Sequence, residues 1–326
     1  MSTENSPKAI IAALLANLGI AATKLVAWLI TGASSMLAES IHSLADSGNQ
    51  VLLLVGGKRA QRPATENHAF GFGRERYVYA FIVSVVLFTV GGLFALYEAY
   101  HKWHEVHEGH EIELLNGNRW LVAVGVLVAA IAMEAFSFKT AISESNKLRG
   151  NLSWVEFIRG AKAPELPVVL LEDFAALIGL ALALAGVGMT VITESGYWDV
   201  AGTACIGVLL VLVAITLAVE TKSLLLGESA QEDKRDLITE AVLAGDDGHD
   251  IIHMRTLHVG PEQILVAIKL GVDRAESAAD IAEAIDATER RIRAAVPEAQ
   301  YIFIEPDIRR AAAGPGGSSR VPEPHP

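Results

Sequence analysis

The sequence lacks the features of a secreted, disulfide-stabilised protein. Its 326 residues include one cysteine, Cys205, which excludes an intrachain disulfide and a thiolate metal cluster. The N-terminus has no cleavable signal pattern, because its first apolar run continues without a small-residue cleavage site. We therefore expect this run to be retained as a membrane span.

Basic residues are also scarce. Lysine and arginine number 26 against 38 acidic residues, which leaves a net charge of −12, and this balance argues against nucleic acid as a partner. Apolar residues, in contrast, make up 52% of the chain, and the mean hydropathy is +0.37. These values predict an integral membrane protein with an attached soluble part.

Six stretches are long and apolar enough to span a bilayer as helices. They cover residues 9–30, 33–57, 77–100, 119–142, 166–192 and 197–221. Lysine and arginine gather in loops 58–76 and 139–162, whereas loop 101–119 is acidic and turn 193–199 has neither. The positive-inside rule therefore predicts a multi-pass protein with cytoplasmic N- and C-termini, and we expect a bacterial-type cell membrane.

Polar residues interrupt the second apolar run at helical spacing. Glu39, His42, Asp46 and Asn49 are separated by three, four and three positions, so they share one face of a helix. An imidazole and a carboxylate four residues apart can touch the same ion. Ionisable side chains at membrane depth are costly and indicate a functional site. The alternative is a polar seam between helices, but such seams use Ser, Thr or Asn rather than Glu, His and Asp.

The other apolar runs carry further charged residues. Glu172 and Asp173 lie in the fifth run, and two helices that bring carboxylates to one depth describe a releasable cation site. Lys24 in the first run is expected to face other helices or the membrane edge. Glu134 in the fourth is either the partner of a buried cation or a proton carrier. Four histidines between 101 and 110 alternate with acids; we expect a solvated acidic loop there, although loose cation binding is open.

After Gly227 the sequence becomes that of a soluble domain. It predicts a helix at 231–244, strands at 251–259 and 264–272 around a hairpin signal, a helix at 276–295 and a strand at 301–305. This α-β-β-α-β order suits a small sheet covered by helices on one face. We place a transmembrane domain at 8–222, a cytoplasmic domain at 230–308 and a disordered tail at 311–326, and we expect 143–165 to be a cytoplasmic link.

Three motifs carry a family resemblance. Ala-Glu-Ser-Ile-His42-Ser-Leu-Ala-Asp46, His68-Ala-Phe-Gly-Phe-Gly-Arg74-Glu-Arg-Tyr and Leu-Pro-Val-Val-Leu-Leu-Glu172-Asp173 occur in this order. Together they resemble the zinc transporter 9 branch of the cation diffusion facilitator family, whose members exchange divalent metals for protons. The resemblance implies an all-α six-helix transmembrane domain, a cytoplasmic α+β ferredoxin-like domain and a homodimer. No nucleophile–base set or HExxH motif is present, so we do not expect an enzyme.

The resemblance also implies a set of metal ligands. The family's HxxxD or DxxxD motif on the second span matches His42 and Asp46. Its HxxxD motif on the fifth span is matched by Asp173, but Val169 occupies the histidine position. Either Glu172 or water is left to supply the missing ligand. Zn²⁺ accepts one histidine and several carboxylates and is the first expectation. Because this carboxylate-rich set is harder than a two-histidine site, Mn²⁺, Fe²⁺ and Co²⁺ stay open.

We accordingly predict proton-coupled efflux of a divalent cation by alternating access, with no cofactor besides the transported ion. The open alternatives are a Mn²⁺, Fe²⁺ or Co²⁺ exporter and a non-transporting membrane metal sensor, in which Val169 would mark the loss of transport. Accessory metal sites are incomplete: His68 stands alone in its loop. The soluble domain offers His253, His258, Glu305 and Asp307, and we expect this domain to act mainly in dimerisation.

Overall fold

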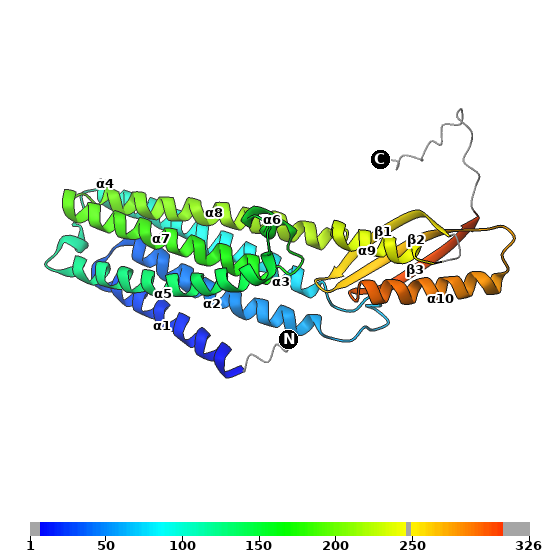
Figure 1. Cartoon of the computed structure of the whole chain (residues 1–326). Helices are drawn as coiled ribbons and strands as arrows, with labels where there is room; N and C mark the ends of the chain where they lie inside the picture. Colours follow the sequence, from blue (N-terminus) through cyan, green and yellow to red (C-terminus); the bar gives the residue numbers. More distant parts are fainter. Residues whose placement is uncertain (1–6, 246–248, 309–326) are drawn as a thin grey trace, which may run out of the picture. The chain divides into compact units, whose positions relative to one another are not determined.

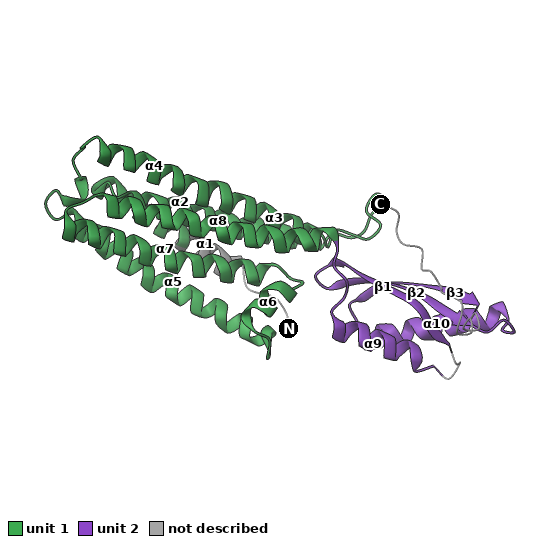
Figure 2. Cartoon of the chain, turned by 90° about the horizontal axis from the view of Figure 1, so that it is seen from above, with its two compact units in different colours: residues 1–226 green, residues 227–326 purple. Residues whose placement is uncertain are grey.

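The computed structural model describes residues 7–245 and 249–308 (Figure 1), and the side chains from residue 17 onward. The predicted tail at 311–326 lies outside the described residues. The chain divides into two compact units, Met1–Leu226 and Gly227–Pro326 (Figure 2). The division falls where the sequence changes from apolar to soluble in character.

The first unit is a bundle of long helices that coincide with the six apolar stretches. Its elements are α1 (Pro7–Thr31), α2 (Ser34–Ala60), α3 (Glu75–Val86), the π-helix η1 (Leu87–Leu93), α4 (Phe94–His107), the 3₁₀ turn η2 (Glu113–Leu115), α5 (Arg119–Arg149), α6 (Trp154–Gly160), α7 (Glu165–Thr193) and α8 (Tyr197–Leu226). Segments α3, η1 and α4 form one continuous helix. The all-α membrane-type domain is thus as predicted.

Four of these helices are long and apolar enough to cross a membrane: Glu75–His107, α5, α7 and α8. Within the described residues, α1 contributes a shorter apolar segment, Asn17–Thr31. Helix α2 is long but carries the polar motif, which lowers its hydropathy although neighbouring helices cover that face. The full count of six spans therefore stays a prediction.

Helix α2 lies at the centre of the bundle and packs against α1, α3, α7 and α8. Met36 and Leu53 of α2 join an apolar core with residues such as Val83, Leu180 and Leu210. Many large apolar side chains point outward instead; Phe136 on α5 is 75% exposed. A continuous apolar exterior of this kind suits lipid rather than water.

The second unit contains the predicted elements in the predicted order. They are α9 (Glu232–Leu243), β1 (Asp250–Gly260), β2 (Gln263–Val272), α10 (Ala278–Ala295) and β3 (Ala299–Ile308). The sheet order is β1-β2-β3, with β1 antiparallel and β3 parallel to β2. Alternate β2 residues, Ile264 to Val272, pack with Ile238 of α9 and Ile292 of α10, so both helices cover one face (Figure 2).

Local structure departs from expectation in three places. The segment 143–165 is not a plain link, because α5 continues to Arg149 and α6 follows, begun by a capping box between Ser153 and Glu156. The first part of the expected outer loop is helical, since α4 extends to His107. The π-helix η1 was not anticipated, and such bulges are frequent at functional sites.

Candidate functional site

The histidine and aspartate of α2 form a pair inside the bundle. Nε2 of His42 lies 3.4 Å from Oδ2 of Asp46; the imidazole is buried and the carboxylate is 18% exposed. Glu39 and Asn49 are buried on the same helix, as the helical period predicts. Among the described residues, neither ring nitrogen of His42 nor Oδ1 of Asp46 has a hydrogen-bond partner. These atoms are therefore open to a ligand.

The adjacent carboxylates of α7 are both buried and reach different neighbours. Oε1 of Glu172 accepts a hydrogen bond from Nδ2 of Asn49 on α2 at 2.7 Å. Oδ2 of Asp173 accepts one from Oγ of Ser137 on α5 at 2.9 Å. The charge of Asp46 interacts with those of both Asp173 and Glu172. The acids of α2 and α7 thus share one region of the bundle.

Val169 occupies the place of the family's second histidine, and it packs against the apolar core. In the part of the chain that the structure describes, no three His, Cys, Asp or Glu side chains are close enough to form a ready metal centre. His42 is with Asp46, Glu172 with Asn49, and Asp173 with Ser137. The four-residue ligand set therefore stays a prediction that requires side-chain rearrangement.

Sequence reasoning missed two partners of this region. Ser137 was not singled out in the sequence, yet its hydroxyl donates a hydrogen bond to Asp173. Lys24 was assigned no partner, and its Nζ lies 3.0 Å from Oε2 of Glu39 and 2.8 Å from Oγ of Ser43. The signal for this pair was present, because the apolar run 9–30 contains one lysine and the helix that follows it contains one glutamate, near its start. Glu134 is partly buried, and its charge interacts with that of Asp173.

The charge balance of the interior favours a cation. Lys24 is the one lysine or arginine among the buried residues in the described ranges. It faces Glu39, so within the described ranges Asp46, Glu172 and Asp173 have no lysine or arginine partner of their own. Carboxylates inside a membrane domain are costly unless they are protonated or bound to a cation. This arrangement suits protons or a divalent ion as alternative occupants.

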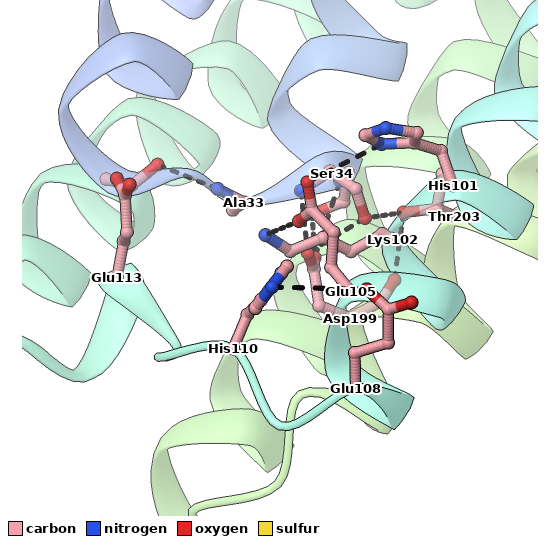
Figure 3. Close-up of polar contacts among 12 residues, drawn as sticks. Ala33, Ser34, His101, Lys102, Glu105, Glu108, His110, Glu113, Asp199 and Thr203 are labelled. Atoms are coloured by element: carbon pink, nitrogen blue, oxygen red, sulfur yellow. Dashed lines mark hydrogen bonds and ion pairs between the residues drawn. The ribbon is translucent and has the colours of Figure 1, made fainter.

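A second polar cluster fixes the start of α2 (Figure 3). Asp199 of α8 is buried and accepts hydrogen bonds from the backbone N–H of Ser34 at 2.7 Å and from its hydroxyl at 2.9 Å. It also accepts one from the hydroxyl of Ser35. Ala33, at the N-cap, cannot provide a side-chain cap, so Asp199 satisfies the first turn of α2 in its place. These bonds give the carboxylate a structural role.

The histidine-rich segment beside this cluster pairs with its own glutamates. His101 lies 3.6 Å from Glu105, and His104 lies 3.1 Å from Glu108, each one helical turn apart. The four side chains are between 35% and 60% exposed. This is the solvated acidic surface expected from the sequence, and it forms no group of three metal-binding side chains within the described residues.

The residues considered for accessory metal sites make local contacts with other side chains. His68 stacks on Phe72, with ring centroids 4.5 Å apart. In the soluble unit, Nζ of Lys269 lies 3.2 Å from Oδ2 of Asp307 and 3.5 Å from Oε1 of Glu305. The hydrogen bond with Asp307, and then the nearby charges, raise the pKa of Lys269. Both carboxylates therefore face a lysine. His253 accepts a hydrogen bond from Arg255 at 2.8 Å.

Comparison with known proteins found one matching family model and several similar proteins. Residues 10–226 match the family model of the cation efflux transmembrane domain. The mitochondrial proton-coupled zinc antiporter SLC30A9 of Xenopus laevis is 33% identical over 233 residues, which are 71% of this chain and 40% of that protein. Its Homo sapiens counterpart is 31% identical over 232 residues, 71% of this chain and 39% of that protein.

Metal tolerance protein C4 of Arabidopsis thaliana is 26% identical over 236 residues, 71% of this chain and half of that protein. The matched part of the chain thus corresponds to about two fifths of the length of the two SLC30A9 proteins.

Proposed function

The chain belongs to the cation diffusion facilitator family, in its zinc transporter 9-like branch, and from this premise we propose that it exchanges Zn²⁺ for protons across a membrane. At the level of the family it is a multi-pass cation efflux transporter and not an enzyme. The ligand set that we propose is His42, Asp46, Glu172 and Asp173. The relatives named as proton-coupled zinc antiporters support zinc as the cargo.

One observation carries the proposal. A buried imidazole lies 3.4 Å from the carboxylate of Asp46, and neither of its nitrogens has a hydrogen-bond partner in the described part of the chain. On the same helix, Asn49 is hydrogen-bonded to Glu172 of α7. Zn²⁺ accepts such nitrogen and oxygen ligands in tetrahedral sites. Every ligand must be deprotonated before the metal binds, so each bound ion displaces protons. Histidine is suited to this exchange because its ordinary pKa lies near neutrality.

Two hydrogen bonds hold the carboxylates of α7 in the structure. Asn49 keeps Glu172 against α2, and Ser137 keeps Asp173 against α5. Binding of the ion replaces these two bonds with bonds to the metal and draws α7 toward the His42–Asp46 pair. Such a site binds adequately and releases readily, as transport requires. Because oxygen ligands dominate, Mn²⁺, Fe²⁺ and Co²⁺ are the competing cargoes.

The helix directions bring the connections within the basic segments 58–76 and 139–162 to the same end of the bundle as Leu226. We propose that this end is the side of cation uptake and that both termini lie there. We also propose a homodimer. The face of the sheet away from α9 and α10 exposes apolar residues, among them Phe303, which supports dimerisation through the soluble unit.

Uptake by purified protein in liposomes tests this function. Zn²⁺, Mn²⁺, Fe²⁺, Co²⁺ and Cd²⁺ are offered separately, and initial rates are compared with those of the His42→Ala variant. We expect saturable uptake, fastest for Zn²⁺, that is lost in the variant. Zinc binding without uptake of any ion would instead support the non-transporting metal sensor.

A further inference from the structure

The Lys24–Glu39 ion pair lies one helical turn from the proposed ligand His42. Both side chains are almost fully buried, at 1% and 0% exposure, and the pair joins α1 to α2. Glu39 precedes His42 by three residues on the same face of α2, which places their side chains next to each other. It is five residues from Ser34, the first residue of α2, or about 7.5 Å along the helix axis.

The pair leaves one oxygen of Glu39 unused. Oε2 receives Lys24, but Oε1 has no hydrogen-bond partner among the described residues. This oxygen faces Gly179 on α7, where a Cβ atom would lie 2.6 Å from it. At Gly91 in η1, a Cβ atom would lie 3.4 Å from methyl groups of Leu210 and Leu87 and 3.9 Å from Nδ1 of His42. The glycine at position 179 thus lets α7 approach Oε1 of Glu39 closely.

A purely structural ion pair would be expected to have both oxygens satisfied, because a buried and half-satisfied carboxylate is costly. A buried carboxylate oxygen without a hydrogen-bond partner, beside an imidazole whose nitrogens also have none among the described residues, is suited to a passing ligand. The charge of that ligand follows from the surroundings. Glu39 and Asp46 lie on either side of His42, so the ligand is a cation.

We propose that Glu39 is a transit subsite for the divalent cation, between the His42–Asp46 pair and the end of the bundle where α2 begins. This inference rests on the proposed function. When the cation is not bound at Glu39, the side-chain ammonium group of Lys24 occupies the subsite. Its second partner, the hydroxyl of Ser43 at 2.8 Å, holds the ammonium while the cation occupies Glu39. The return of Lys24 to Glu39 then competes the cation off.

Three variants test the subsite: Lys24→Met, Glu39→Gln, and the two substitutions combined. The combination removes both charges, so it avoids the unpaired buried charge that each single change leaves. Ser40→Ala is the matched control, because it deletes another buried α1–α2 contact, the 3.0 Å hydrogen bond to the carbonyl of Ala21, without changing charge. Equilibrium Zn²⁺ binding in detergent and initial Zn²⁺ uptake into liposomes are measured for each protein.

Removal of the positive charge should tighten Zn²⁺ binding by about tenfold or more in Lys24→Met and slow its uptake, because the competitor is gone. The combined variant should fold and bind Zn²⁺ at the His42–Asp46 pair, yet transport about tenfold more slowly than Ser40→Ala, because the cation loses the Glu39 charge on its path. If Lys24→Met or Glu39→Gln misfolds, the combined variant still tests the subsite.

Two results would overturn the subsite. One is a combined variant that transports at the rate of Ser40→Ala, which would reduce the pair to a structural contact. The other is a folded Lys24→Met protein with unchanged Zn²⁺ affinity. Measurements on the wild-type protein distinguish failure of the subsite from failure of the proposed function. If the wild-type protein moves no divalent cation, the proposed function is refuted. If it transports normally and one of the two results above is obtained, only the subsite is refuted.

Discussion

Replacing Glu172 with glutamine removes one buried negative charge and keeps the size of the side chain. The amide oxygen of the new side chain can still accept the 2.7 Å hydrogen bond from Asn49, so packing between α2 and α7 is retained. The variant therefore tests the charge of Glu172 rather than its shape. Asp173→Asn is the matched change one position later, where the hydrogen bond from Ser137 is likewise retained.

The expected magnitude follows from Coulomb's law. Two unit charges about 4 Å apart interact by about 4 kcal/mol at an effective dielectric constant of about 20, and a divalent ion doubles this. Desolvation of the carboxylate offsets much of the gain, and truncation of one partner in a buried charge pair costs about 2–5 kcal/mol. A loss of about 3 kcal/mol weakens Zn²⁺ binding by about 100-fold.

The assay is titration of the purified variants with Zn²⁺ against a competing fluorescent chelator, followed by uptake into liposomes. Glu172→Gln and Asp173→Asn should be impaired to a similar degree. If Glu172→Gln binds and transports Zn²⁺ like the wild type while Asp173→Asn does not, Glu172 is a structural partner of Asn49. The site would then comprise His42, Asp46, Asp173 and either Asn49 or water.

Three further variants test position 169, the role of the soluble unit, and an ion pair within that unit. Val169→His adds an imidazole one turn before Asp173, so the ratio of Zn²⁺ to Mn²⁺ uptake should rise; an unchanged ratio would place position 169 outside the site. Deletion of residues 231–326 should weaken dimerisation, measured by light scattering, yet preserve intramembrane Zn²⁺ binding; loss of binding in a folded truncation would show that the ion is elsewhere. In the soluble unit, the 2.8 Å bond from Lys234 lowers the pKa of Glu298 below its ordinary 4.5. The stabilisation is complete above that ordinary value and is lost as pH falls through the lower folded value. In the Lys234→Met variant, hydrogen-exchange protection of the soluble unit should therefore fall less steeply at acidic pH than in the wild type. The same dependence of protection on pH in both proteins would contradict this assignment.

The sequence predicted those features that depend on period and composition. A repeat of 3.6 residues is sufficient to bury Glu39, His42 and Asn49 on one face of α2. Alternation along 264–272 was likewise sufficient to predict strand β2 and its covered face. These inferences required no knowledge of which helices are neighbours.

Features that depend on the relative position of helices could not be predicted in this way. The pairing of Lys24 with Glu39 requires the register of α1 against α2, and the bond from Ser137 to Asp173 requires that of α5 against α7. Asp199 reaches the start of α2 across 165 residues of sequence. In helix α2, the residues of the polar motif lower the mean hydropathy, although the bundle buries Glu39, His42 and Asn49.

The most direct test of the central claim measures zinc and protons together. Liposomes containing the wild-type protein and a trapped pH indicator receive Zn²⁺ outside, and uptake and internal pH are recorded at once. We expect internal pH to rise as Zn²⁺ enters, because each ion displaces protons from the His42–Asp46 region, and we expect Asp46→Asn to abolish both signals. Zn²⁺ uptake that leaves internal pH unchanged, or that persists in Asp46→Asn, would contradict this expectation.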